Sequence, residues 1–261
     1  MSSSAAPCLI ALDTATEVVH LALCEGGRVH AHAVGGGAQA SVSTLPALNA
    51  VLAQADLAWS DVQAIAFGRG PGAFTGLRTS CAIAQGLALG LGIPVLALDT
   101  LLAVAEAARQ DHPDIEQALQ LDAHASLWVL QDARMSEVYA ASFRWVNGRW
   151  QADQAPVLWP LAHLRERVAS GQLRLVAGSA LLAYPDDVAG LAEQGACLAP
   201  DARPHGRALA ALAQTAWAAG EAQDAALALP LYVRDKVAQT TAERTAERTA
   251  ERAATAGGVA P

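Results

Sequence analysis

The sequence predicts an α/β protein of two lobes, each built on a mixed sheet with helices packed against it. Three observations lead to this prediction. The chain opens with segments typical of an antiparallel meander, then alternates between helical and strand patterns, and turns polar at residues 111–114 before further strands begin. With 261 residues and 53% hydrophobic content, the chain is long and apolar enough to bury a large core.

The first lobe is expected over residues 1–110. Alternating apolar residues mark its strands, and leucines three or four residues apart mark its helices. In chain order we expect strands at 8–13, 18–24 and 28–34, a helix at 40–56, a strand at 62–67, a glycine-rich loop at 68–76, a helix at 77–91, a strand at 95–99 and a helix at 101–109.

The second lobe is expected over residues 111–235 and looks reduced. Its predicted elements are strands at 126–132, 137–145 and 173–178, a turn at 147–148, and helices at 161–169 and 207–219. The last of these helices has the length to pack back on the first lobe. Residues 236–261 contain T-A-E-R three times, which predicts a solvated, frayed helix or disorder rather than a partner-binding tail.

Composition excludes several kinds of protein. A formal charge of −8 argues against independent binding of a nucleic-acid backbone. The chain's one lysine, Lys236, does not follow a glycine-rich turn, which excludes a lysine-based P-loop. Four widely separated cysteines indicate a reducing compartment, the cytoplasm, and the first residues do not resemble a signal peptide.

One uncharged stretch, Cys81–Leu98, is long enough to raise the possibility of a membrane span. The glutamine, glycines and proline within it favour a buried helix that ends before a short interior strand. We therefore expect no membrane segment.

The sharpest local signal is the loop R-G-P-G-A-F-T-G-L-R. It combines flexible glycines, a threonine suited to cap a helix, and two arginines at the helix entrance. Two interpretations stay open: an anion-binding or interface loop, and a tight turn between strand and helix. The residues concerned are Arg69, Gly70, Gly72, Thr75, Gly76 and Arg78.

The helix after this loop is apolar all round, with rows of small residues at intervals of four. Such a helix needs cover on both sides, and the neighbouring helix at 40–56 supplies only part of it. We therefore predict that the helices at 40–56 and 76–91 bind a partner. The alternative is that both are completely buried within one molecule. The candidate contact residues are Leu45, Leu48, Leu52, Ala82, Ile83, Gly86, Leu87 and Gly90.

Signals for catalysis are weak. The D-T-A-T turn at residues 13–16 resembles a metal- or phosphate-binding strand end but carries no glycine. His30 and His32 share a strand face without a third ligand, so a solvated face is expected. The charges Asp132, Arg134 and Glu137 could line a cleft between the lobes, although a structural role in a strand turn is favoured. We therefore predict no metal site.

Taken in order, five motifs resemble the bacterial TsaB (YeaZ) family over residues 8–243. They are I-A-L-D-T-A-T-E, G-R-G-P-G-A-F-T-G-L-R, A-Q-G-L-A-L-G, D-A-R-M-S-E-V-Y and P-L-Y-V-R-D-K-V-A. The resemblance implies a fold of the actin, sugar-kinase and Hsp70 class (ASKHA) with two related lobes. It also implies membership of the complex that attaches threonylcarbamoyl to the adenosine beside the tRNA anticodon.

In that family the catalytic paralogue, TsaD, carries a metal-binding H-x-x-x-H at the start of its first helix. Here the corresponding region is G-G-A-Q-A-S-V-S-T-L-P, and Gln39 and Ala40 stand where polar residues and histidine are often found. The resemblance thus implies a pseudo-enzyme without a cofactor of its own, whose partners TsaD and TsaE handle ATP and metal and which meets tRNA only through the complex. Pairing through two helices from each partner is implied, and the same apolar helices could pair with each other in a homodimer when TsaD is absent.

Other functions remain as alternatives. An ATP-binding kinase or ATPase of the same fold would need an adenosine loop, and V-A-G-S-A at 176–180 is a poor version of one. A homodimeric scaffold would use the same apolar helices. Peptidase chemistry lacks both a nucleophile and metal ligands in this sequence. The triple T-A-E-R repeat also extends past the usual end of the family.

Overall fold

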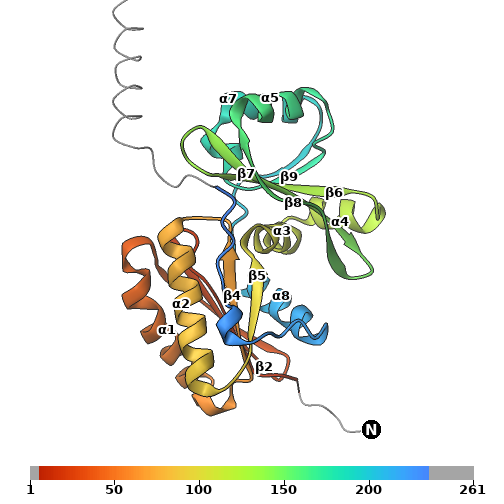
Figure 1. Ribbon diagram of the computed structural model, residues 1–261. Coiled ribbons are helices and arrows are strands. Elements are labelled where there is room, and N and C mark those ends of the chain that lie inside the picture. Colours follow the sequence, from red (N-terminus) through yellow and green to blue (C-terminus); the bar gives the residue numbers. More distant parts are fainter. Residues whose placement is uncertain (1–5, 235–261) are drawn as a thin grey trace, which may run out of the picture.

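Two five-stranded sheets form the centres of the two lobes in the computed structural model, which describes residues 6–234 (Figure 1). The first sheet has the order β3-β2-β1-β4-β5, in which β1, β2 and β3 are antiparallel and β1, β4 and β5 are parallel. Its strands are β1 (Leu9–Asp13), β2 (Val18–Glu25), β3 (Arg28–Gly35), β4 (Ala64–Gly70) and β5 (Val95–Asp99). The predicted mixed sheet is confirmed.

Helices cover both faces of this sheet, and the sequence of β1 reflects that position. Every residue of L-I-A-L-D in β1 is buried. Ile10 and Leu12 pack in the core beneath α1 (Ala40–Gln54) and α2 (Phe74–Leu91), whereas Leu9 and Ala11 pack in the core beneath α8 (Gly206–Ala218). Because alternate residues of a strand point to opposite faces, a strand with helices on both faces is apolar throughout.

The uncharged stretch at 81–98 divides as predicted. Helix α2 ends at Leu91, Gly92 caps it in a left-handed conformation at φ 68°, and β5 begins at Val95. None of the helices within residues 6–234 combines the length and hydrophobicity that crossing a bilayer requires. The start of α2 differs from the prediction: the helix begins at Phe74, so its N-cap is Ala73 and Thr75 lies in the first turn.

The second sheet repeats the topology of the first, with the order β10-β9-β6-β7-β8. Its strands are β6 (Ser126–Asp132), β7 (Glu137–Val146), β8 (Arg149–Pro160), β9 (Leu175–Ala177) and β10 (Cys197–Ala199). Strands β6, β7 and β8 are antiparallel, whereas β6, β9 and β10 are parallel. The second sheet therefore has as many strands as the first, but β9 and β10 have only three residues each.

The remaining helices cover the second sheet or join the lobes. Helix α3 (Thr100–Asp111) lies between the two sheets and is followed at once by α4 (Pro113–Leu121), where the polar residues led us to expect a break. Proline at the first position and Asp114 and Glu116 in the first turn favour the start of a helix there. Figure 1 shows α5 (Leu161–Ala169) and α7 (Pro185–Glu193) on the second sheet, and α6 (Ala180–Ala183) contacts β6 and α7.

Helix α8 returns to the first lobe, where it packs against β1, β2, β3 and β5. Short 3-10 turns complete the described chain: η1 (Gly37–Gln39), η2 (Trp59–Asp61) and η3 (Ala225–Leu227). The T-A-E-R repeats predicted as a tail lie outside the described residues.

Candidate functional site

The turn after β1 holds a carboxyl group that the fold uses internally. Asp13 is fully buried; one carboxylate oxygen accepts from the backbone N–H of Ala15 at 2.7 Å and the other from the Thr100 hydroxyl at 2.8 Å. A Cβ on Gly68 would lie only 1.9 Å from this carboxylate, so β4 packs directly against it. Burial raises the pKa of Asp13 by more than these two hydrogen bonds lower it.

The glycine-rich loop packs against this turn. The Thr14 hydroxyl donates to the carbonyl of Gly76 at 2.6 Å, and a Cβ on Gly76 would lie 2.0 Å from the carbonyl oxygen of Thr14. A Cβ on Gly72 would lie 2.7 Å from the Cβ of Ala15 and 3.0 Å from its carbonyl oxygen. The glycines therefore serve a close approach of two backbone segments, as the tight-turn interpretation requires.

The two arginines of the loop each engage a different partner. Arg69 forms an ion pair with Asp99 at the end of β5, with 2.6 Å between Nε and the carboxylate. The guanidinium of Arg78 stacks on the Phe74 ring at 3.8 Å and its Nε donates to the Tyr232 hydroxyl at 3.2 Å. Thr75 is exposed and caps no helix end. Within residues 6–234, no three His, Cys, Asp or Glu side chains gather as a metal site would require.

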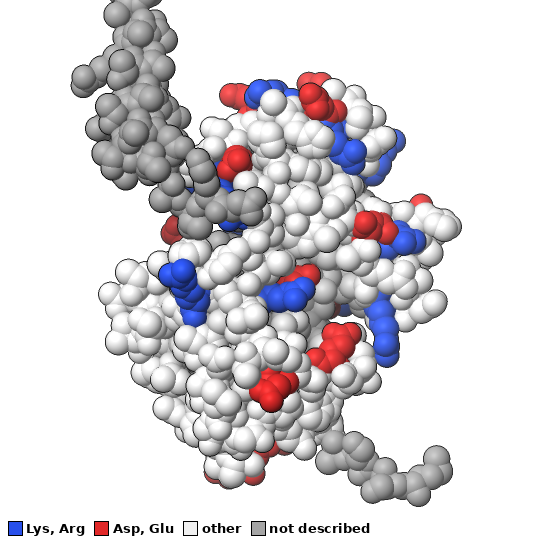
Figure 2. Space-filling view, viewed as in Figure 1, with Lys and Arg blue, Asp and Glu red and all other residues white. Residues whose placement is uncertain are grey.

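The exposed surface of the helix pair α1 and α2 carries Arg78 in the first turns of α2 and is otherwise uncharged. Figure 2 shows this region, at the lower left of the molecule, almost without charged side chains. Val42 is 65% exposed, Leu45 41% and Leu89 62%. Beside them lie the exposed small residues Ala82, Gly86 and Gly90. We call the surface formed by these six residues the α1–α2 face.

The other predicted contact residues lie deeper. Leu48 and Leu52 are 1% and 3% exposed and pack in the chain's own core, so they are not available to a partner. Ile83 and Leu87 are half-buried and pack against the same core. Leu48 and Leu52 share the inner side of α1 with Val51, and Val42 lies on its outer side. Leu45, in the second turn of the helix, lies at the border between the two sides and keeps 41% of its surface exposed.

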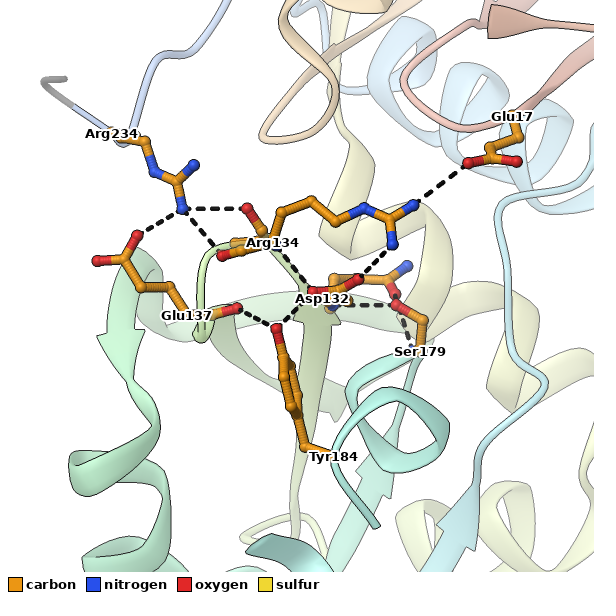
Figure 3. Close-up of polar contacts among 9 residues, drawn as sticks. Glu17, Asp132, Arg134, Glu137, Ser179, Tyr184 and Arg234 are labelled. Atoms are coloured by element: carbon orange, nitrogen blue, oxygen red, sulfur yellow. Dashed lines mark hydrogen bonds and ion pairs between the residues drawn. The ribbon is translucent and has the colours of Figure 1, made fainter. Parts of the chain in front are cut away.

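The polar cluster predicted in the second lobe surrounds the turn between β6 and β7 (Figure 3). One oxygen of Asp132 accepts from the backbone N–H of Arg134 at 2.8 Å and from the Tyr184 hydroxyl at 2.7 Å. Arg134 reaches from this turn to Glu17 in the first lobe at 3.3 Å. The contacts of Asp132 tie the strand turn together, and the contact of Arg134 with Glu17 bridges the lobes.

The region compared above with an adenosine loop is tightly packed. Gly178 has φ +114°, and a Cβ there would lie 2.5 Å from the carbonyl oxygen of Leu130. The side chain of Gln131 accepts from the backbone N–H of Ser179 at 2.8 Å. This glycine lets the end of β9 lie close against β6.

A cavity of about 330 Å³ between the lobes was not anticipated from the sequence. It is lined by α3, α8 and the hairpin of β7 and β8, and its most unusual wall residue is Glu106, which is 2% exposed. That carboxylate accepts from Arg109 at 2.8 and 2.9 Å and from the indole N–H of Trp150 at 2.9 Å. The sequence signal that could have indicated this cavity was Glu106, a charged residue after the apolar first half of α3.

Comparisons with known proteins agree with this geometry. A family model described as TsaD, tRNA N6-adenosine threonylcarbamoyltransferase, matches residues 37–261. The tRNA threonylcarbamoyladenosine biosynthesis protein TsaB of Escherichia coli is 32% identical over 236 residues, covering 88% of this chain and 96% of that protein.

Two solved structures from Pseudomonas aeruginosa have the same fold. One, described as similar to the peptidase YeaZ, is 33% identical and covers 87% of this chain and 100% of its own, with a TM-score of 0.72. The other, YeaZ, is 31% identical and covers 87% of this chain and 99% of its own, with a TM-score of 0.68. The predicted ASKHA-type fold of two related lobes is confirmed.

Proposed function

Since this chain belongs to the TsaB family, whose members act in tRNA threonylcarbamoyladenosine biosynthesis, we propose that it serves there as a non-catalytic subunit that pairs with the catalytic TsaD protein. In this role it holds TsaD in an active arrangement and helps to recruit the ATPase TsaE. It needs no cofactor of its own and meets tRNA through its partners, since its formal charge of −8 disfavours direct binding of a nucleic acid.

The α1–α2 face is the observation that carries this proposal. Exposed Val42, Leu45 and Leu89 lie there beside exposed small residues, and such an apolar surface is typical of a protein interface. A Cβ added to Gly86 or Gly90 would meet nothing within 4 Å. These glycines are therefore not needed for packing within the chain, whereas they would let a partner helix approach closely.

The strand-end turns support the non-catalytic part of the proposal. Both oxygens of Asp13 already accept hydrogen bonds, and the carboxylate has no solvent exposure. A metal–phosphate group at this position would have to displace the Thr100 hydroxyl and separate β4 from β1. That rearrangement would cost buried hydrogen bonds, so ATP handling fits the partner proteins better.

Gly86→Leu is the most direct test. Leucine at this open position removes the cost of glycine in a helix, about 0.5–1 kcal/mol, so the isolated chain should fold normally. The same side chain projects from the α1–α2 face and should abolish co-elution with TsaD and tRNA modification in a mixture with TsaD and TsaE. Ala192→Leu on the exposed side of α7 adds comparable bulk elsewhere and should leave both activities intact.

Two results would contradict the proposal. If the Gly86→Leu variant co-elutes with TsaD as the parent protein does, the α1–α2 face is not the binding surface for TsaD. Micromolar ATP binding by the isolated chain in calorimetry, with hydrolysis, would instead support an ATPase. Sedimentation without TsaD, compared between parent and Gly86→Leu, shows whether the face also forms a homodimer.

A further inference from the structure

The last described residues run from one lobe to the other. After η3, residues 229–234, here called the strap, leave the first lobe and end beside the turn between β6 and β7 (Figure 1). The backbone N–H of Leu231 donates to the carbonyl of Arg69 at 2.7 Å. The Tyr232 ring lies 5.1 Å from the Phe74 ring, and its hydroxyl accepts from Arg78. The strap is thus anchored on the glycine-rich loop of the first lobe.

Its other end is anchored on the second lobe through one guanidinium. Arg234 donates from Nη2 to the carbonyls of Ala133 at 3.0 Å and Arg134 at 3.3 Å, and to the carboxylate of Glu137 at 2.5 Å. Its side chain is only 15% exposed. Figure 3 shows Arg234 entering from the strap and meeting this turn. Hydrogen bonds of this kind, made by a charged group shielded from water, are stronger than neutral ones.

The turn that Arg234 contacts has an unusual backbone. Arg134, Met135 and Ser136 are consecutive and have φ of 63°, 56° and 57°. L-residues rarely adopt the left-handed conformation, and three in succession persist only where the surroundings fix them. The strap supplies part of that support, since its guanidinium is bonded to the carbonyls at the start of the turn.

The same turn projects a side chain back across the lobes. Arg134 is 75% exposed and reaches Glu17, in the turn between β1 and β2, at 3.3 Å. Glu17 is itself 87% exposed, so this ion pair alone would contribute little. The position of Arg134 depends on the turn, and the turn is held by the strap. Contacts between the lobes at this side of the molecule are therefore coupled.

We propose that the strap is a latch that fixes the relative orientation of the two lobes through Tyr232 on the first lobe and Arg234 on the second. The chain passes between the lobes covalently at α3–α4 and between β10 and α8. Those connections act as a hinge, and the strap closes the side where Arg134 reaches Glu17. Release of the strap lets the lobes rotate about the hinge and frees Arg134 from Glu17.

Interlobe distances in the full chain test the latch. Nitroxide labels at Arg28→Cys on the first lobe and Glu193→Cys on the second, both exposed positions, would be placed in a Cys197→Ala background, because the other native cysteines are buried. Arg234→Ala removes one anchor, Tyr232→Ala removes the other, and Arg234→Lys keeps the charge without the planar fork. Arg165→Ala is the matched control, since its ion pair with Asp187 lies within the second lobe.

The latch predicts a broader, shifted distance distribution for Arg234→Ala and Tyr232→Ala, a smaller change for Arg234→Lys, and none for Arg165→Ala. Hydrogen exchange of the Glu137 amide, which bonds to the Arg134 carbonyl, should also accelerate roughly tenfold in Arg234→Ala. Faster exchange with unchanged interlobe distances would show that the strap supports only its turn, and would overturn the proposal. Unchanged exchange and distances would overturn it as well. Because Tyr232 is 46% exposed, its variant remains a test if Arg234→Ala fails to fold.

Discussion

Removal of the buried carboxylate at Glu106 should cost more stability than any surface ion pair in the protein. Its side chain is 3% exposed and accepts two hydrogen bonds from Arg109, one from Gln110 at 2.7 Å and one from Trp150 in β8. Glu106→Ala leaves these donors without their acceptor. Breaking a buried pair in this way costs about 3–5 kcal/mol.

The lower end of this range applies, because Arg109 keeps a second partner. Its Nη1 donates to Glu116 at 2.8 Å, and the Arg109 side chain is 17% exposed. We therefore expect Glu106→Ala to lower the free energy of unfolding by about 3 kcal/mol. Glu116→Ala is the control: its carboxylate is 41% exposed, and its loss should cost at most about 1 kcal/mol.

Urea unfolding at pH 7, followed by circular dichroism and by tryptophan fluorescence, measures both variants. Coincident transitions with an unchanged m-value would allow the midpoints to be compared directly. Equal losses for Glu106→Ala and Glu116→Ala would refute the reasoning, since they would mean that water replaces the buried contacts at little cost.

Three further predictions concern single buried positions. The raised pKa of Asp13 means that its stabilising contribution is complete below the ordinary value of 3.8 and is lost as pH rises through the folded-state pKa. Asp13→Asn should therefore gain stability relative to the parent as pH rises above 3.8 in urea titrations, whereas a constant difference would contradict this. Gly178→Ala should lower Tm by several degrees in calorimetry, because φ is +114° and the Leu130 carbonyl lies 2.5 Å from the new Cβ; an unchanged Tm would show that the turn adapts. Burial raises the pKa of Cys24 to about 12, so a thiol reagent at pH 8 should leave it unmodified until the chain unfolds, as peptide mass spectrometry can verify.

The sequence was sufficient to predict the central elements because most of their residues are buried and apolar. Strand β1 is apolar at every position up to Asp13, and α8 lies close to its predicted bounds. Strand β8 was missed because it is an edge strand with Gln, Asp and Pro among its residues and little burial. Helix α7 was also not predicted, although its sequence carries a signal for a helix start: Pro185 is followed by two aspartates in the first turn.

The candidate site was harder to predict than the fold. The sequence of an apolar helix such as α1 does not reveal where its buried side ends, so Leu45 and Leu48 seemed equivalent until their exposures of 41% and 1% separated them. The strap depends on contacts such as Arg234 with Ala133, 101 residues apart in the chain. No local periodicity carries that information.

The central strands of the two lobes end in the same way, each with an aspartate that the fold itself binds. This arrangement fits the proposed function, in which the chain carries out no chemistry. Asp13 ends β1 and Asp132 ends β6, and each accepts from the backbone N–H two residues further on, at 2.7 and 2.8 Å. The second oxygen of Asp13 is bonded to Thr100, and that of Asp132 lies 3.1 Å from the Arg134 guanidinium. A metal–phosphate group between the lobes would compete with these bonds at both ends, and in the second lobe it would also disturb the turn that the strap holds. Under the proposed function, the same carboxylates hold the two strand-end turns rather than a nucleotide, which fits a subunit that acts by presenting the α1–α2 face to a partner.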